Sequence, residues 1–327
     1  MKMLSKALLV TREVIGEENA GQRIDNYLLR ICKGVPKSHV YQILRSGQVR
    51  ANGKRIDPAY RLLAGDEIRI PPVRMRGPRS GAAGVPVGKP FRVVYEDESL
   101  LVIDKPAGTA VHGGSGVSFG VIEQLRRQRP DARLLELAHR LDRETSGLLL
   151  IAKKRTALTA LHGMFRDGAM HKTYLTLVRG RWLNPLQHVK LPLTKYLTGE
   201  GERRVSVDRE GKSAHSIMRL LRRWENFSLL EVELKTGRTH QIRVHLAHLG
   251  FPLAGDDKYG DFGLNKDLAK AGLKRMFLHA ARLDLAHPVS RAPLALSAPL
   301  PGDLTDFVAR LNINERVDFE AADVVPV

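Results

Sequence analysis

One segment near the middle of the chain reads His139-Arg140-Leu141-Asp142-Arg143-Glu144-Thr145-Ser146-Gly147 and continues directly into Leu148-Leu149-Leu150-Ile151-Ala152. The second part is a short apolar run, which is typical of a buried strand. The polar part predicts a tight loop in which Asp142 stands between Arg140 and Arg143. Since nearby positive charge favours the charged form of a carboxyl group, we expect Asp142 to be ionised. The segment thus fixes one carboxylate at the start of a rigid strand, where a catalytic group can be held in place.

A second informative segment reads Lys235-Thr236-Gly237-Arg238-Thr239-His240-Gln241-Ile242-Arg243-Val244-His245. It predicts a strand, a glycine-containing turn and a helix over 240–249, with Thr239 as a possible cap and Arg243 one turn inside. Two interpretations of these arginines are open: Arg243 pairs with a carboxylate elsewhere in the chain, or the helix is amphipathic and its arginines meet solvent or phosphate. The histidines at 240, 245 and 248 lack the i, i+4 spacing of helical zinc sites and do not share one face. We therefore expect no metal.

Charge and composition restrict the class of protein. The chain has 327 residues, 43% of them apolar and 27% charged, which suits a soluble globular protein of two or three domains. Its formal net charge of +18 indicates a polyanionic partner, with nucleic acid as the first candidate and a membrane surface as the second. No apolar run is long enough to span a membrane, and Ala7–Val10 is too short for a signal-peptide core. We expect a cytoplasmic protein in which the single cysteine, Cys32, is a packing residue.

The N-terminal region, residues 18–80, predicts a small basic domain. The residues Ile24, Tyr27, Leu28 and Ile31 share one helical face, and Ser38 can cap a second helix closed by Gly47. Asn52-Gly53 predicts a hairpin, with a further strand at 64–70. Residues 1–80 hold 16 Lys and Arg against 7 Asp and Glu, a net charge of +9. Such cations usually form a solvated face, but on this pattern they favour phosphate contacts by Lys37, Arg45, Arg50, Lys54 and Arg55.

Residues 71–90 contain five Pro and four Gly and predict a linker. The remainder, 91–327, predicts one large α+β domain. Its strands arrive in pairs more often than they alternate with helices, which favours a mixed, largely antiparallel sheet with flanking helices over a doubly wound one. Gly116-Val117-Ser118-Phe119-Gly120 fits the nucleophile elbow of serine hydrolases, but it does not follow a strand. We interpret Ser118 as the cap of a helix at 118–129. Neither a Walker loop nor a Gly-x-Gly-x-x-Gly motif occurs, so no nucleotide cofactor is indicated.

The segment at 139–147 resembles the second motif of the RluA-type pseudouridine synthases, and the segment at 235–245 resembles their third. The resemblance extends over nearly the whole chain, because residues 18–80 are similar to the alpha-L RNA-binding fold. It implies a pseudouridine synthase fold, no cofactor and an RNA substrate. It also implies that Asp142 is catalytic, that Arg243 pairs with it, and that Tyr174 in Lys172-Thr173-Tyr174 stacks on the target base. Leu278 is then an apolar wall of the pocket, Arg140 occupies the space of the extruded base, and Arg238 and His240 contact the substrate.

Lys105–Gly116 and Ser118–Glu123 resemble the subgroup of this family that modifies several uridines in large-subunit ribosomal RNA, subgroup C. Subgroup D is the alternative within the family, and a non-catalytic RNA-binding ribosome-assembly protein is the alternative outside it. The resemblance implies isomerisation of uridine, in which uracil leaves the sugar, turns over and rejoins through carbon. Three roles of Asp142 stay open: attack on the sugar, attack on the base, or removal of a sugar proton. We expect a monomer that acts on ribosomal RNA or a pre-ribosomal particle.

Overall fold

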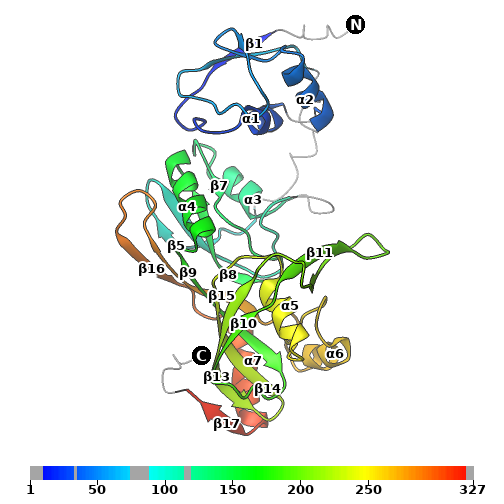
Figure 1. Ribbon diagram of the computed structural model, residues 1–327. Helices are drawn as coiled ribbons and strands as arrows, with labels where there is room; N and C mark the ends of the chain where they lie inside the picture. The colour runs from blue at the N-terminus through cyan, green and yellow to red at the C-terminus, as the bar shows by residue number, and fades with distance from the viewer. Residues whose placement is uncertain (1–9, 33–34, 74–87, 114–118, 322–327) are drawn as a thin grey trace, which may run out of the picture. The chain divides into compact units, whose positions relative to one another are not determined.

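The computed structural model describes residues 10–32, 35–73, 88–113 and 119–321. The chain forms two compact units, Met1–Gly88 and Lys89–Val327, which are drawn in Figure 1. Most of the predicted linker and the expected cap Ser118 lie outside the described residues. The same holds for most of the Gly-x-Ser-x-Gly pattern.

The N-terminal unit packs two helices against a small sheet. The helices are α1 (Ile24–Ile31) and α2 (Lys37–Arg45), and the strand order is β1 (Thr11–Val14), β4 (Glu67–Ile70), β2 (Arg50–Ala51) and β3 (Lys54–Arg55). The predicted hairpin is confirmed: Asn52 and Gly53 both have positive φ, as a tight two-residue turn requires. Cys32 is buried in the core of this unit, as expected. Strand β1 gave no signal in the sequence.

The predicted cap of α2 is wrong. Pro36 precedes the helix with φ of −58°, and no side chain caps it. A proline suits a helix start because its φ is already fixed near the helical value and the helix needs no amide hydrogen there. Ser38 therefore lies inside the first turn of α2.

The large unit is built on a sheet of eleven strands, which confirms the predicted α+β fold class. The path runs through β10 (Leu186–Lys190), β13 (His215–Trp224), β14 (Phe227–Leu234), β9 (His171–Arg179), β15 (Leu278–Ala286), β8 (Ser146–Ala152), β6 (Leu100–Lys105) and β5 (Arg92–Glu96). Strands β7 (Glu136–Leu137), β16 (Pro293–Ser297) and β17 (Val317–Glu320) pair beside this path. Within the described part of the chain, β8 and β15 form the one parallel pair. A separate hairpin joins β11 (Leu193–Leu197) to β12 (Arg203–Val207).

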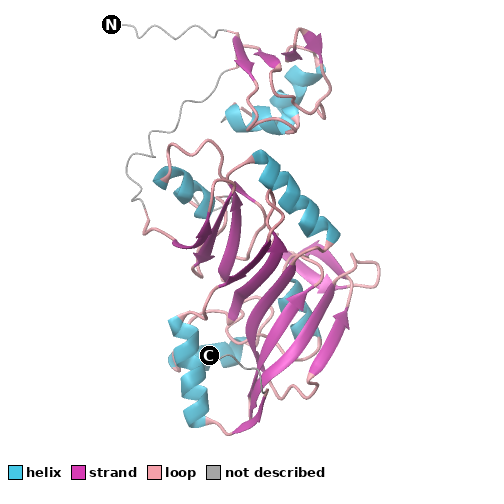
Figure 2. Cartoon of the chain, turned by 90° about the vertical axis from the view of Figure 1, so that its left-hand side faces the viewer, coloured by secondary structure: helices cyan, strands magenta, loops and turns pink. Residues whose placement is uncertain are grey.

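Five helices cover the two faces of this sheet (Figure 2). Helices α3 (Val121–Gln128) and α4 (Arg155–Asp167) pack on alternate residues of β6 and β8, and so lie on opposite faces. Helix α5 (Gln241–His248) packs on β13 and β14 from one side, while α6 (Phe262–Lys270) and α7 (Gly302–Asn314) pack from the other. Each half of the sheet therefore carries helices on both faces, while the outer strands β5 and β10 stay largely exposed.

The parallel pairing of β8 and β15 positions the Asp142 loop. Its register contains only two residue pairs, His279 with Ser146 and Ala280 with Gly147. Gly147 has φ of +107°, and a Cβ atom there would lie 2.3 Å from the carbonyl oxygen of Ala280. Only glycine permits this approach. The glycine that ends the first segment thus brings the loop of one half of the sheet against a strand of the other.

A buried histidine, His279, lies at this contact between β8 and β15. The Nδ1 atom of His279 lies 2.9 Å from the Ser146 hydroxyl, and its Nε2 atom lies 3.1 Å from the carbonyl oxygen of Ala298. A neutral ring satisfies both contacts, with Nε2 donating to the carbonyl and Nδ1 accepting from the hydroxyl. Burial lowers the pKa of His279 to about 4.

We expect His279→Gln to flatten the loss of stability in acid. The pKa of an unfolded histidine is about 6.5, so between pH 6.5 and 4 the unfolded chain takes up a proton that folded His279 does not. Above pH 6.5 the contribution of His279 to the free energy of unfolding is fully present. Between pH 6.5 and 4 this contribution falls by up to about 1.4 kcal/mol per pH unit. Urea unfolding at pH 7 and pH 5 measures the difference. An equal pH dependence of the free energy of unfolding in both proteins would contradict this role.

Candidate active site

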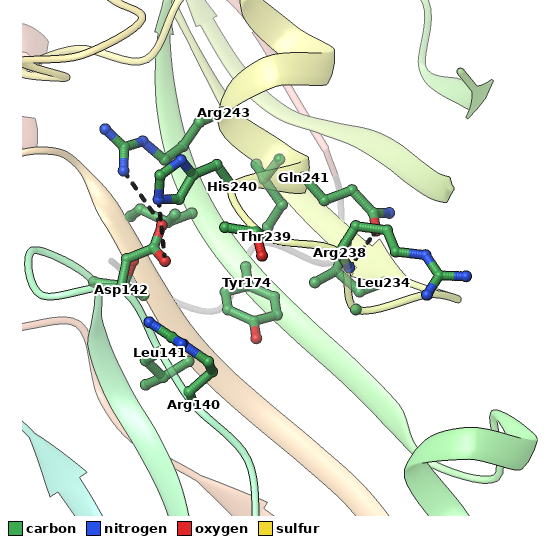
Figure 3. A pocket seen from close by; sticks show the side chains of 14 residues that line it. Arg140, Leu141, Asp142, Tyr174, Leu234, Arg238, Thr239, His240, Gln241 and Arg243 are labelled. Atoms are coloured by element: carbon green, nitrogen blue, oxygen red, sulfur yellow. Dashed lines mark hydrogen bonds and ion pairs between the residues drawn. The ribbon is translucent and has the colours of Figure 1, made fainter. Parts of the chain in front are cut away.

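One pocket brings the two informative segments together, as Figure 3 shows. Its empty volume, which includes space open to solvent, is about 620 Å³. The lining residues come from the Asp142 loop, β9, the end of β14, α5 with its preceding turn, and β15. They are Arg140, Leu141, Asp142, Thr145, Tyr174, Leu234, Gly237, Arg238, Thr239, His240, Gln241, Ile242, Arg243 and Leu278.

The predicted ion pair between Asp142 and Arg243 is present. The Nη1 atom of Arg243 lies 3.3 Å from Oδ2 of Asp142, and the arginine side chain is only 6% exposed. The same guanidinium donates from Nε and Nη2 to Asp256 at 2.7 and 2.6 Å. Burial alone would lower the pKa of Arg243, but Asp256 and Asp142 raise it above its usual value. Arg243 is thus a permanently charged and rigidly held group at the pocket floor.

The cations beside Asp142 differ from those expected from the loop itself. Arg143 turns away, because its Nε atom donates to the carbonyl oxygen of Gly108 and lies 3.4 Å from Glu144. Arg140 is exposed at the pocket rim and forms no ion pair within the described residues. The basic side chains beside Asp142 are instead the Arg243 guanidinium and the His240 ring, both from about a hundred residues further along the chain. Arg140 and Arg143 thus flank Asp142 in the sequence without pairing with its carboxylate.

His240 holds a constrained position at the start of α5. Its φ is +53°, which costs a residue other than glycine on the order of 1 kcal/mol or more. Its Nδ1 atom lies 2.8 Å from the Tyr259 hydroxyl, and its Nε2 atom lies 3.7 Å from Asp142. Burial lowers the pKa of His240 although Asp142 acts in the opposite direction. The expected cap by Thr239 is wrong, since His240 precedes the helix and no side chain caps it.

Tyr174 and Leu278 give the pocket an apolar side. They lie on the neighbouring strands β9 and β15, where Tyr174 pairs with Ala280 and Leu278 pairs with Thr176. Leu278 is buried, and Tyr174 is half-buried with its ring directed towards the space beside Asp142 (Figure 3). Burial raises the pKa of Tyr174, and the charge of Asp142 adds to this effect, so the hydroxyl is neutral. A flat apolar surface therefore faces the carboxylate.

Sequence reasoning missed several side chains that build the site. Gln241 accepts from the Arg238 amide and the Thr236 hydroxyl, and it donates to the carbonyl oxygen of His215. Asp256 and Tyr259 hold Arg243 and His240. A glutamine at a helix start can be found from capping patterns, whereas the two residues after the helix carry no pattern that indicates a role.

His240 and His245 have separate surroundings. His245 contacts the Ser216 hydroxyl at 3.1 Å and the carbonyl oxygen of Leu191 at 2.9 Å, away from the contacts of His240. Among the residues that the structure describes, no three His, Cys, Asp or Glu side chains are arranged to hold a metal ion. No helix in the described ranges is long and apolar enough to cross a membrane.

Comparison with known proteins agrees with this geometry. Residues 99–248 match the family model described as RNA pseudouridylate synthase, and residues 22–68 match that of the S4 domain. Ribosomal large subunit pseudouridine synthase C of Salmonella typhimurium is 50% identical over 296 residues, which cover 89% of this chain and 93% of that protein. The chain belongs to the RNA pseudouridylate synthase family.

Other relatives of this synthase support the assignment. The protein of the same description from Escherichia coli strain K12 is 49% identical over 303 residues, 91% of this chain and 95% of that protein. Human RNA Pseudouridylate Synthase Domain Containing 1 has the same fold, with a TM-score of 0.59 and 24% identity over 73% of this chain and 93% of that one. The predicted family, the pseudouridine synthase fold, the N-terminal RNA-binding fold and the enzyme class are confirmed.

Proposed function

We propose that this synthase converts specific uridines of large-subunit ribosomal RNA to pseudouridine. The observation that carries the proposal is the Asp142–Arg243 ion pair on the floor of a pocket walled by Tyr174 and Leu278. The names of relatives with about 50% identity over nearly the whole chain support this RNA and subgroup C over subgroup D. A non-catalytic assembly protein does not require an ion pair at a pocket, in which a buried arginine contacts a partly exposed carboxylate.

Asp142 is the catalytic carboxylate in this proposal. Breaking the bond between uracil N1 and the sugar builds positive character on the sugar, which an adjacent carboxylate can stabilise or trap. Uracil leaves as a stabilised anion, so no second acid is required. It then turns over and forms the new bond from C5 to the sugar. The hydrogen on C5 is lost to water as a proton and N1 takes up a proton, so that the product is an isomer of the substrate.

The remaining pocket residues receive the flipped uridine. A base in a helix must leave its stack to reach such a pocket. Tyr174 stacks on the uracil and Leu278 closes the apolar side, since base–aromatic stacking stabilises an extruded base. Arg140, on the exposed rim, fills the space that the base has left. Arg238 and His240 contact the substrate from the turn before α5.

A basic cleft adjoins the pocket and suits the RNA backbone. It is lined by the hairpin of β11 and β12, by the turn before α5 and by the Asp142 loop. Its cations are Arg140, Lys195, Arg203, Arg204 and Lys258, and Tyr196 lies among them. Arginine and lysine contacts to phosphates fix an RNA in register without reading its sequence. We place the strand that flanks the target uridine here.

The N-terminal domain, residues 18–80, supplies a second grip on RNA, and residues 91–327 are the catalytic domain. The side chains proposed to bind phosphate are all exposed: Lys37, Arg45, Arg50, Lys54 and Arg55. None of the five forms an ion pair with another described residue. Lys37 and Arg45 instead flank the Tyr41 ring at 5.8 and 5.9 Å. The protein acts as a cytoplasmic monomer without a cofactor in this proposal.

Release of tritium tests the function. A large-subunit ribosomal RNA transcript labelled at C5 of uracil is incubated with the purified protein, and tritium in water is counted. We expect one equivalent of tritium for each pseudouridine formed. A protein that binds the transcript but releases no tritium is a binder, and the proposal is then wrong. Mapping pseudouridines in ribosomal RNA with and without the protein identifies the sites.

Substitutions in the N-terminal domain should change the salt dependence of RNA binding. Each lost phosphate contact reduces the slope of log affinity against log salt by roughly 0.7–0.9. We therefore expect the double variant Lys37→Gln/Lys54→Gln to lower that slope by about 1.5. The matched control is Arg12→Gln, because Arg12 is also an exposed cation of this domain but engages Glu67 at 2.9 Å. Filter binding at several salt concentrations measures both. Equal slopes for the double variant and the native protein would show that Lys37 and Lys54 do not contact RNA phosphates.

A further inference from the structure

Arg243 is shared unequally among three carboxylates, of which the exposed Asp257 lies 3.6 Å from Nη2. Asp256 takes the side of the guanidinium that carries Nε and Nη2, at 2.7 and 2.6 Å, in the bidentate geometry that arginine favours. Asp142 receives only Nη1, at 3.3 Å. Asp256 therefore sets the plane of the guanidinium and leaves one nitrogen directed at the reacting carboxylate.

Asp256 is itself held from several directions. It is completely buried, and its Oδ1 atom also accepts from the amides of Lys258 and Tyr259 at 2.8 and 3.0 Å. Its main-chain oxygen accepts from the Asn265 side chain at 2.7 Å. Burial would raise the pKa of Asp256, but Arg243 and these amides lower it, so the group is an anion. A carboxylate fixed in this way cannot follow movements of the substrate.

The charge balance leaves Asp142 reactive. Three carboxylates surround one guanidinium, and the buried Asp256 offsets most of the positive charge of Arg243, since Asp257 is exposed to solvent. Among the described residues, the ion-pair partner of Asp142 Oδ1 is His240, at 3.7 Å, which is beyond hydrogen-bonding distance. Without Asp256, Arg243 could turn and bind both oxygens of Asp142. Such a pair would hold the carboxylate in its ground state and oppose its action on the sugar or the base.

Tyr259 extends the same turn to other parts of the site. Its ring lies 5.1 Å from the centre of the Arg243 guanidinium, and its hydroxyl is 2.8 Å from Nδ1 of His240. The hydroxyl also accepts from the amide of Val205 in β12, at 3.0 Å. The turn after α5 thus contacts Arg243, His240 and the hairpin beside the pocket.

We propose that Asp256 is a positioning residue for pseudouridine formation, which aims Arg243 at Asp142 and limits how strongly the two bind. Tyr259 transmits this arrangement to His240 and β12. The inference rests on the proposed function, since the rate of uridine isomerisation is its readout. Asp256 does not line the pocket, so we expect its main effect on the reaction to pass through Arg243.

The first test compares Asp256→Asn with the native protein in single-turnover tritium release from the labelled transcript. We expect the rate constant to fall at least about 30-fold, while the Kd for the same transcript stays within about threefold, because Asp256 does not contact RNA. Asp267→Asn is the matched control, since Asp267 is an exposed carboxylate of α6 paired with Lys270. It should release tritium at the native rate. A native rate in Asp256→Asn overturns the inference.

A double-variant cycle separates positioning from general damage to the fold. Arg243→Gln removes the guanidinium, and Arg243→Gln/Asp256→Asn then replaces a buried charged pair by a neutral one, which restores the balance of buried charge. If Asp256 acts through Arg243, adding Asp256→Asn to Arg243→Gln changes the rate by less than about twofold. Independent effects would multiply instead, and this outcome would exclude the positioning role. Absence of tritium release by the native protein would contradict the proposed function and is a separate result.

Discussion

Asp142→Asn should abolish pseudouridine formation while RNA binding is retained. The amide has the same shape as the carboxylate but carries no charge, so it can neither stabilise positive character on the sugar nor act as a nucleophile. We expect tritium release to fall at least about 1,000-fold, on the scale seen when an essential group of an active site is removed. The Kd for the labelled transcript, measured by filter binding, should stay within about threefold, because RNA affinity comes from exposed cations elsewhere.

Glu144→Gln is the matched control for this variant. Glu144 lies two residues further in the same loop, and its carboxylate contacts Arg143 rather than the pocket. It should convert uridine at close to the native rate. Should Asp142→Asn still produce pseudouridine at more than a few per cent of the native rate, Asp142 is not the catalytic carboxylate. Loss of activity in both variants would indicate damage to the loop as a whole.

Arg243→Lys should also slow the reaction strongly, although the charge is preserved. A lysine offers a single ammonium and cannot bind Asp256 at two points while also reaching Asp142. The expected loss in tritium release is about 100-fold, the order seen when one preorganised donor is removed from an active site. The free energy of unfolding should also fall, by about 2 kcal/mol, because the buried Asp256 then lacks one of its hydrogen bonds.

Urea unfolding and single-turnover kinetics together check the Arg243→Lys variant. Arg238→Lys provides the comparison, since Arg238 is exposed and its Nε atom donates only to the carbonyl oxygen of Ser213. It should have native stability and a smaller loss of rate. If Arg243→Lys is as active as the native protein, the bidentate arrangement has no part in the reaction.

Much of the secondary structure could be predicted, because it depends on short sequence patterns. Asn52-Gly53 specifies its hairpin, and the apolar run after Gly147 specifies a buried strand. Strands such as β1 and β17 were missed because they are short, largely exposed and lack alternation. Caps were wrong at α2 and α5 because a proline and a histidine with left-handed backbone begin these helices instead.

The candidate site was only partly visible in the sequence. The resemblance of two motifs identified Asp142 and Arg243 as partners, and the structure brings them within 3.3 Å. The sequence did not predict which other charged side chains contact these two residues. Arg143 is next to Asp142 in the chain yet faces Glu144, whereas Asp256 is distant yet binds Arg243. Side-chain direction depends on packing between segments that no local pattern relates.

The two residues of the ion pair stand 101 positions apart. The two sides of the site meet at a parallel contact with only two residue pairs in register. Long-range contacts form after the chain has lost most of its freedom, since closing a large loop costs entropy before any contact repays it. A nascent chain in which the region around Arg243 has not emerged can already hold the Asp142 strand but has no charged pair. If the ion pair is required for catalysis, as proposed, such a chain is inactive on RNA until the segment around Arg243 has folded against the Asp142 loop.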